Sequence, residues 1–288
     1  VAKGLYTGNV SLNAGVLEVN SSSGNTTTDS ALGTGIITNN GATLRNNNGN
    51  GVGNVIVWNG NCILDCNNTT KSWQGAWQGT GTVLLTNMIA SGNTYTVGGN
   101  GNGSGNMTYF TGSVIISSAN SDASPTAGTF RFNNGGGSPN IGNPLMTLAL
   151  GQGLVHFSEK TRGTTHSFGA LFGGPGTMLV TSENYAIGGL GLANDVFSGT
   201  ILSTSTFTKN GAGQFTWNNL TNNVYSGITT INNGILQIGD GVTVAAGSLG
   251  SGAISLLGGA LVYNKPDAFS ITNKMSGSGG SFIKTNVN

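Results

Sequence analysis

Residues 207–263, FTKNGAGQFTWNNLTNNVYSGITTINNGILQIGDGVTVAAGSLGSGAISLLGGALVY, decide the fold of this chain. The stretch contains short runs in which apolar and polar residues alternate, and each run lies between Gly, Asn or Ser residues that turn the chain. Each run has the length of a β-strand. The runs comprise residues 214–217, 229–231, 235–238, 253–256 and 260–263.

A partial copy of this stretch lies at the N-terminus. Residues 6–19 match residues 225–238 at a constant offset of 219, and residues 32–44 match residues 249–261 at an offset of 217. The match extends over about forty positions and keeps glycines in register, so it indicates an internal repeat rather than a coincidence of composition. The change of offset falls in a loop, where changes of length are tolerated.

The composition restricts the kind of repeat. The chain has 288 residues with 51 Gly, 5 Pro and 7% charged residues, so Gly would interrupt nearly every turn of a helix. A hydrophobic content of 36% and a net charge of +1 argue against disorder, because disordered chains are poor in apolar residues and strongly charged. The composition therefore predicts an all-β protein.

Glycine signatures favour parallel coils over an antiparallel sandwich. A Gly-x-Gly pair followed by a strand occurs four times, and the hairpins of a sandwich would not need glycines in register. Stacked coils place equivalent residues in ladders about 4.8 Å apart, so the corners repeat because the geometry repeats. The four pairs begin at Gly79, Gly174, Gly211 and Gly277.

The same residues resemble a known family, the autotransporter-associated β-strand repeat. Residues 207–262 are similar to its pattern K-x-G-x-G-x-L-x-L, Y-[ST]-G-x-T-x-I-x-x-G-x-L and L-G-[ST]-G-x-[IV]-x-[VL]-x-G-G-x-L, and residues 6–44 match the later parts of it. The resemblance implies a right-handed parallel β-helix in large secreted or surface proteins of bacteria, without catalytic residues of its own. Its autotransporter members end in a membrane barrel, and no such segment is expected within residues 1–288.

Residues 1–288 are therefore expected to form a single continuous β-solenoid with Gly- and Asn-rich corners and a few protruding loops. Between residues 62 and 166 only fragments of the pattern survive, so this part is the least regular. The loops are expected at residues 98–105 and 133–144.

The densest ionisable cluster lies in residues 154–166, LVHFSEKTRGTTH. A carbohydrate lyase or hydrolase on the flank of the helix could use such groups to neutralise a uronate and to move a proton. The favoured interpretation is a solvated polar corner, because only nine carboxylates are scattered along the chain. The candidate residues are His156, Glu159, Lys160, Arg162 and His166.

Two other residue pairs are candidates for function. Trp73 and Trp77, in SWQGAWQG, are the best candidates for a glycan contact, although filling of the core is the favoured role of the tryptophans. Cys62 and Cys66 lack the second pair of ligands that a structural zinc needs, and a short disulfide is preferred over free thiols. The sequence predicts no metal site and no cofactor.

The function expected from these patterns is that of a non-catalytic extracellular rod, structural or adhesive, at a bacterial surface or matrix. The alternative is a carbohydrate-active β-helix. The near-zero charge offers nucleic acid no electrostatic attraction, and no run is long enough for a membrane helix. Residues 281–286 match the opening of a repeat unit, and residues 3–8 match the next part of the same unit. The expected partners are therefore copies of the chain associated end to end, or neighbouring repeats of a longer chain. Glycans or a cell surface are further expected partners.

Overall fold

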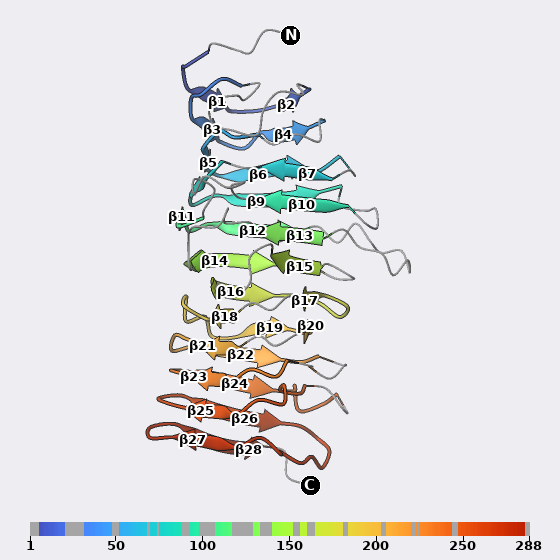
Figure 1. The fold of residues 1–288 in the computed structure, drawn as a ribbon, viewed down its shortest axis with the longest axis vertical. Coiled ribbons are helices and arrows are strands. Elements are labelled where there is room, and N and C mark those ends of the chain that lie inside the picture. Colours follow the sequence, from blue (N-terminus) through green and yellow to red (C-terminus); the bar gives the residue numbers. More distant parts are fainter. Residues whose placement is uncertain are drawn as a thin grey trace.

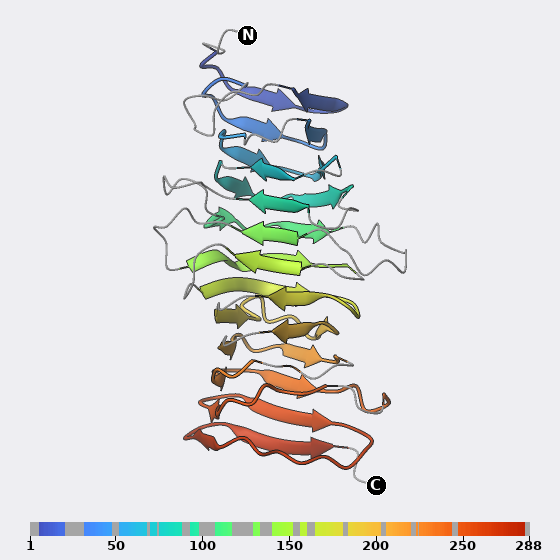
Figure 2. The ribbon, with the colours of Figure 1, turned by 45° about the vertical axis from the view of Figure 1, so that its right-hand side comes forward.

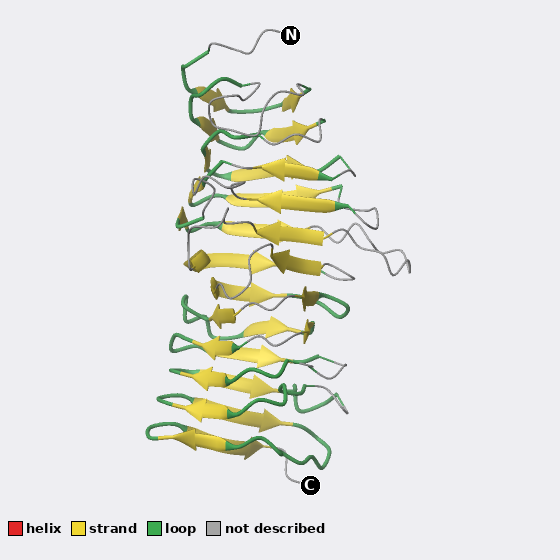
Figure 3. Ribbon diagram, in the orientation of Figure 1, coloured by secondary structure: helices red, strands yellow, loops and turns green. Residues whose placement is uncertain are grey.

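The computed structural model describes residues 6–20, 32–47, 52–67, 70–73, 75–87, 93–97, 107–116, 129–132, 140–151, 156–159, 165–180, 184–202, 206–219, 223, 225–243 and 247–285. These residues form a parallel β-helix, or β-solenoid, whose coils are stacked along one axis with the N- and C-terminal ends at opposite ends of the stack (Figures 1 and 2). They contain strands and loops and no helix (Figure 3). The all-β prediction and the prediction of stacked parallel coils are confirmed.

The strands belong to four sheets, and every pairing between them is parallel. The longest sheet has twelve strands, two sheets have five, and one has six. The first five-stranded sheet contains β1 (Val10–Leu12), β3 (Ile37–Asn39), β5 (Ile56–Trp58), β8 (Trp77–Gly79) and β11 (Tyr109–Phe110). The six-stranded sheet contains β7 (Lys71–Trp73), β10 (Thr94–Val97), β13 (Thr129–Phe132), β15 (His156–Glu159), β17 (Met178–Val180) and β20 (Thr200–Leu202).

The twelve-stranded sheet runs along the whole stack. It contains β2 (Val16–Val19), β4 (Thr43–Asn46), β6 (Asn61–Asp65), β9 (Thr82–Thr86), β12 (Ser113–Ile116), β14 (Asn140–Ala149), β16 (Thr165–Phe172), β18 (Asn184–Ile187), β21 (Phe207–Lys209), β23 (Thr229–Ile231), β25 (Ile254–Leu256) and β27 (Met275–Gly277). The second five-stranded sheet contains β19 (Asp195–Phe197), β22 (Gln214–Trp217), β24 (Ile235–Ile238), β26 (Ala260–Asn264) and β28 (Ser281–Thr285).

Two long strands, β14 and β16, join the two halves of the stack. The C-terminal part of β14 pairs with β12, whereas the N-terminal part of β16 pairs with β18. The register between β14 and β16 shifts between Asn143 and Thr147, which indicates a bulge where the pair bends. The predicted loop at residues 133–144 is therefore corrected, because Asn140 to Pro144 belong to β14. Residues 133–139 and the predicted loop at 98–105 lie outside the described residues.

Alternation within each strand builds the core. Successive side chains point to opposite faces of a strand, so one apolar set faces inward in every coil. Stacking then aligns these sets: Leu44 pairs with Leu64, Leu64 with Leu85, and Leu85 with Ile116, and all four are buried. Aromatic rings fill the wider parts of the interior; the Trp77 ring lies 5.0 Å from Trp58 and 5.9 Å from Phe110.

The Gly-x-Gly signature marks a corner that no larger residue fits. Gly211 has a φ of +68°, and Gly213 lies so close to the preceding coil that a Cβ atom would be 1.8 Å from the Leu192 carbonyl oxygen. Lys209, the first residue of this motif, is buried and donates hydrogen bonds from Nζ to the carbonyls of Asn210 and Gly211. The Lys209 side chain therefore closes the corner by binding the backbone carbonyls of its own motif.

The strands predicted in the regular unit are confirmed at residues 214–217, 229–231 and 235–238. The predicted run 253–256 begins one residue later in the structure, and 260–263 ends one residue later. No helix in the described part of the chain is long and apolar enough to span a membrane.

Candidate functional site

The structure separates the residues of the predicted ionisable cluster. His156 and Glu159 lie on β15 in the six-stranded sheet, whereas His166 lies on β16 in the twelve-stranded sheet. His166 is fully buried, and its ring stacks at centroid distances of 5.6 Å from Tyr185 and 6.2 Å from Phe168. Both interpretations of His166, the favoured solvated corner and the alternative proton-transfer site, are therefore corrected, because alternation along β16 points its ring into the core. Lys160 and Arg162 lie outside the described residues.

The two candidate glycan-binding tryptophans also face the core. Trp73 and Trp77 are both 0% exposed, so neither offers a ring face to a sugar in this fold. The glycan contact proposed for them is corrected, and filling of the core, the role favoured for the tryptophans, describes their positions. Each lies on a short strand, β7 or β8, whose alternation directs the ring inward.

The predicted disulfide is also corrected, because Cys62 and Cys66 are free and buried thiols. Cys62 lies on β6 and Cys66 follows its last residue. Four residues of extended strand span about 13 Å, whereas a disulfide joins Cα atoms about 4.4–6.8 Å apart. Burial raises the pKa of both thiols above the ordinary value, so neither is an activated nucleophile.

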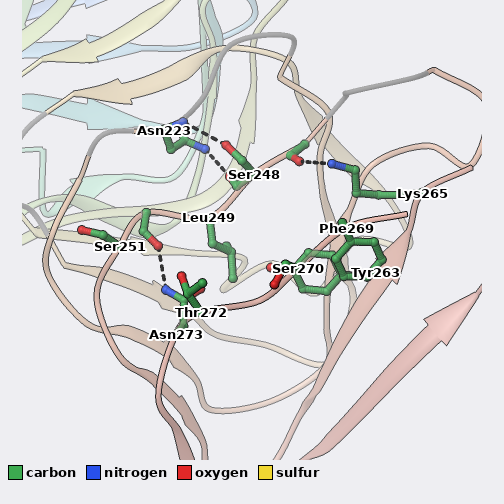
Figure 4. Close-up of a pocket in the computed structure, with 12 residues that line it drawn as sticks. Asn223, Ser248, Leu249, Ser251, Tyr263, Lys265, Phe269, Ser270, Thr272 and Asn273 are labelled. Atoms are coloured by element: carbon green, nitrogen blue, oxygen red, sulfur yellow. Dashed lines mark hydrogen bonds between the residues drawn. The ribbon is translucent and has the colours of Figure 1, made fainter. Parts of the chain in front are cut away.

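A hollow near the C-terminal end of the stack was not predicted from the sequence. It has a volume of about 300 Å³ and lies between loops of three successive coils (Figure 4). The first coil contributes Asn223, and the second contributes residues 247–251. The third contributes Tyr263 at the end of β26, Lys265, and residues 269–273 except Ile271. We call this hollow the coil pocket. Its lining residues are far apart in the repeat, so no local motif indicates it.

Asparagine side chains hold the loops of the coil pocket together. The Asn223 side-chain oxygen accepts a hydrogen bond from the Ile201 backbone N–H at 2.7 Å. The Asn223 backbone N–H donates to the Ser248 hydroxyl oxygen at 2.9 Å. The Asn273 amide donates to the carbonyls of Gly250 and Gly252 at 2.8 and 2.6 Å. These bonds define the shape of the pocket before any ligand is present.

One wall of the coil pocket is aromatic and carries a buried ammonium group. The Tyr263 and Phe269 rings stack with centroids 4.5 Å apart, and burial raises the pKa of the Tyr263 hydroxyl. Lys265 is 9% exposed, and its Nζ donates to the Gly247 carbonyl at 3.1 Å and lies 5.9 Å from the Phe269 centroid (Figure 4). The Lys284 Nζ lies 5.1 Å from the same ring. This wall therefore combines apolar surface with positive charge.

A second pair of ionisable groups lies in the core, away from the pocket. Asp195 and Lys209 are each 1% exposed, and no ion pair within the usual distance joins them. Burial raises the pKa of the Asp195 carboxyl to about 6, an effect that the charge of Lys209 opposes. Burial lowers the pKa of Lys209 to about 8 for the same reason. The Asp195 Oδ1 atom has no hydrogen-bond partner among the described residues.

The fold defines the class of this protein as a parallel β-helix. Over 143 residues the chain is 32% identical to the "Adhesin BmaC autotransporter" of Brucella suis biovar 1 (strain 1330). The aligned part covers 47% of this chain, and the chain spans about 4% of the length of that relative. No family model matches the sequence, and no solved structure matches the chain. The similarity to an autotransporter adhesin supports the predicted resemblance to autotransporter proteins in general. Membership of the autotransporter-associated β-strand repeat family stays a prediction.

Proposed function

We propose that this chain is part of an extracellular adhesive rod on a bacterial surface, with no catalytic activity of its own. The observation that carries this proposal is the continuous stack of parallel coils, which extends the chain along one axis and gives it a long side surface for contacts. The similarity to an autotransporter adhesin supports the adhesive role and the surface location. The burial of His166 removes one of the groups that a catalytic site would need.

Adhesion by the isolated chain tests this proposal. Beads coated with the chain should be retained on cultured host cells or extracellular matrix more strongly than beads coated with the same chain after heat unfolding. A reducing-sugar assay with acidic and neutral polysaccharides should show no release. Retention equal to that of the unfolded control would contradict the adhesive role, and saturable sugar release would favour the carbohydrate-active alternative.

End-to-end association remains a proposal for the ends of the rod. β27 and β28 each pair on one side within the described residues, and Met275, Phe282 and Ile283 beside them are about two-fifths exposed. A further coil, from the same polypeptide or from a second copy, would pair with these strands and cover these side chains. Sedimentation over a range of concentrations tests the second case: a mass that stays monomeric would exclude self-association.

A further inference from the structure

We propose that the coil pocket binds an acidic sugar unit, with the sugar carboxylate at Lys265 and the ring against Leu249 and Phe269. This inference rests on the proposed adhesive function, for which it supplies a ligand class. The pocket residues come from three coils, so the site exists only in the folded stack (Figure 4).

The buried charge of Lys265 indicates an anionic ligand. An ammonium group has three donors, and the Gly247 carbonyl is the acceptor that the structure shows for Lys265. No ion pair joins Lys265 to a carboxylate in the described part of the chain. A buried charge is unfavourable unless it is paired, and a ligand carboxylate would pair it.

The placement of positive charge points the same way. Residues 240–288 contain three lysines, Lys265, Lys274 and Lys284, and two acids, Asp240 and Asp267. Lys265 and Lys284 both lie within 6 Å of the Phe269 centroid. Two of the three lysines therefore place their charge beside the aromatic wall of the pocket.

The other walls fit a sugar rather than a small inorganic anion. The hydroxyls of Ser251, Ser270 and Thr272 make no hydrogen bond to another described residue, so they are free to bind ligand hydroxyls. Leu249 and Phe269 add apolar surface to the same lining (Figure 4). A volume of about 300 Å³ lies at the lower end of the range for small-molecule sites. Phosphate alone would leave the hydroxyl and apolar walls unused.

Calorimetric titration of the whole chain with simple glycosides tests the proposal. Methyl β-glucuronide and the methyl glycoside of N-acetylneuraminic acid should bind in the millimolar range, and methyl β-glucoside should bind at least about tenfold more weakly because it cannot pair with Lys265. Equal binding of the acidic and neutral glycosides, or no saturable binding of either acidic glycoside, would overturn the proposal. This comparison needs no variant.

Substitutions locate the binding. Lys265→Met keeps the apolar stem and should weaken glucuronide binding about tenfold, as expected for loss of a charge-assisted hydrogen bond. Lys274→Met is the matched control, because Lys274 is exposed and does not line the pocket. Circular dichroism would confirm that both variants are folded. Equal weakening by both variants would mean non-specific attraction and would contradict the assigned site.

Two further arms separate the possible failures. If inorganic phosphate binds as tightly as the glucuronide and Phe269→Leu changes neither, the pocket is an anion site and the sugar assignment is wrong. If coated beads adhere to cells but no acidic glycoside binds, the pocket inference fails while the adhesive function stands. If the glycosides bind at Lys265 but the beads do not adhere, the pocket inference stands and the adhesive function fails.

Discussion

The N-terminal and C-terminal copies of the repeat share their corners and differ in the residues between them. After the N-terminal copy, the Asn54 amide donates back to the carbonyls of Gly33 and Gly35 in that copy at 3.1 and 2.8 Å. After the C-terminal copy, Asn273 makes the same two bonds to Gly250 and Gly252. We call this arrangement the asparagine clamp. It fixes one coil on the next in both copies.

The columns that contain Arg45 and Val262 have different chemistry in the two copies. In the N-terminal copy, Arg45 lies between Glu18 and Asp65 and pairs with both at 2.5 and 2.7 Å. The corresponding column of the C-terminal copy is Gln237, Val262 and Ile283. The comparison teaches that glycines and clamps hold the coils, while the positions between them are free to vary and can acquire specific chemistry.

The loops that follow the two copies differ in the same way. The buried residue at the end of β4 is Asn46, and its counterpart on β26 is Tyr263. The segment from Tyr263 to Asn273 is two residues longer than the segment from Asn46 to Asn54. This longer loop carries Lys265 and Phe269, and it therefore builds the coil pocket on a scaffold that the two copies share.

The largest expected effect tests the shared corners. A Cβ atom on Gly252 would lie 1.9 Å from the Gly227 carbonyl oxygen, so Gly252→Ala should lower the free energy of unfolding by roughly 3 kcal/mol or more. Gly15→Ala is the control, since Gly15 has a φ of +80° but no atom within 4 Å of the added Cβ, and it should lose only about 1 kcal/mol. Urea unfolding measures both. Equal losses would show that close approach of the coils does not select glycine.

The next effect concerns the buried Asp195, which neither copy contains. Its folded pKa of about 6 is above the unfolded value, so the folded state binds the proton more tightly and stability should fall as pH rises through this range. The melting temperature should therefore be higher near pH 4.5 than near pH 7, by an amount equivalent to at most about 3 kcal/mol. In Asp195→Asn this dependence should disappear. A melting temperature that rises from pH 4.5 to 7 in the wild type and not in the variant would reverse the assigned sign.

A smaller effect compares the two asparagine clamps. Asn54 is almost fully buried, so Asn54→Ala leaves two carbonyls without a donor in the core and should cost about 2 kcal/mol. Asn273 is partly exposed, so water can replace its bonds and Asn273→Ala should cost about 1 kcal/mol. Denaturant titration of the two variants checks the order. If Asn273→Ala is the more damaging, burial does not decide the strength of the clamp.

The smallest effect is expected in the charged column of the N-terminal copy. Arg45 and Glu18 are partly exposed, so their pairing is screened by salt, and the buried Asp65 keeps hydrogen bonds from Asn67 and Asn87. Arg45→Gln should therefore lower the melting temperature slightly at low ionic strength and hardly at all at high ionic strength. Both carboxylate partners raise the pKa of Arg45, so the guanidinium stays charged at every working pH. Val262→Gln, at the equivalent position, should show no salt dependence. A loss that persists in high salt would mean that the Arg45 stem, not its charge, stabilises the column.

The sequence predicted the coils because their signals are local. Alternation over three to five residues and a Gly-x-Gly pair before a strand determine where the chain is extended and where it turns, and these signals do not depend on distant neighbours. The prediction was weaker around β14 and β16, because a strand that bends across a corner has no short alternating run to mark it.

The functional candidates were harder to predict for a physical reason. Trp73, Trp77 and His166 are residue types that occur on either face of a strand, and a shift by one residue exchanges the inner and outer faces. The Cys62 and Cys66 spacing fits a short bond in a loop but not in the extended strand that forms there. The fold class can be predicted from the spacing of the apolar residues alone. The exposure of these side chains also depends on which face of each strand points inward.

The pattern of residues is enough to predict a stack of parallel β-coils with glycine corners and two matching copies of one unit. Which side chains face inward, and which loops meet, follows only from the folded arrangement. Asn223, Lys265 and Asn273 are brought to one hollow by the stacking of three coils, and such a meeting depends on loop lengths and register summed over many residues. The local alternation of apolar and polar residues therefore does not predict which loops come together.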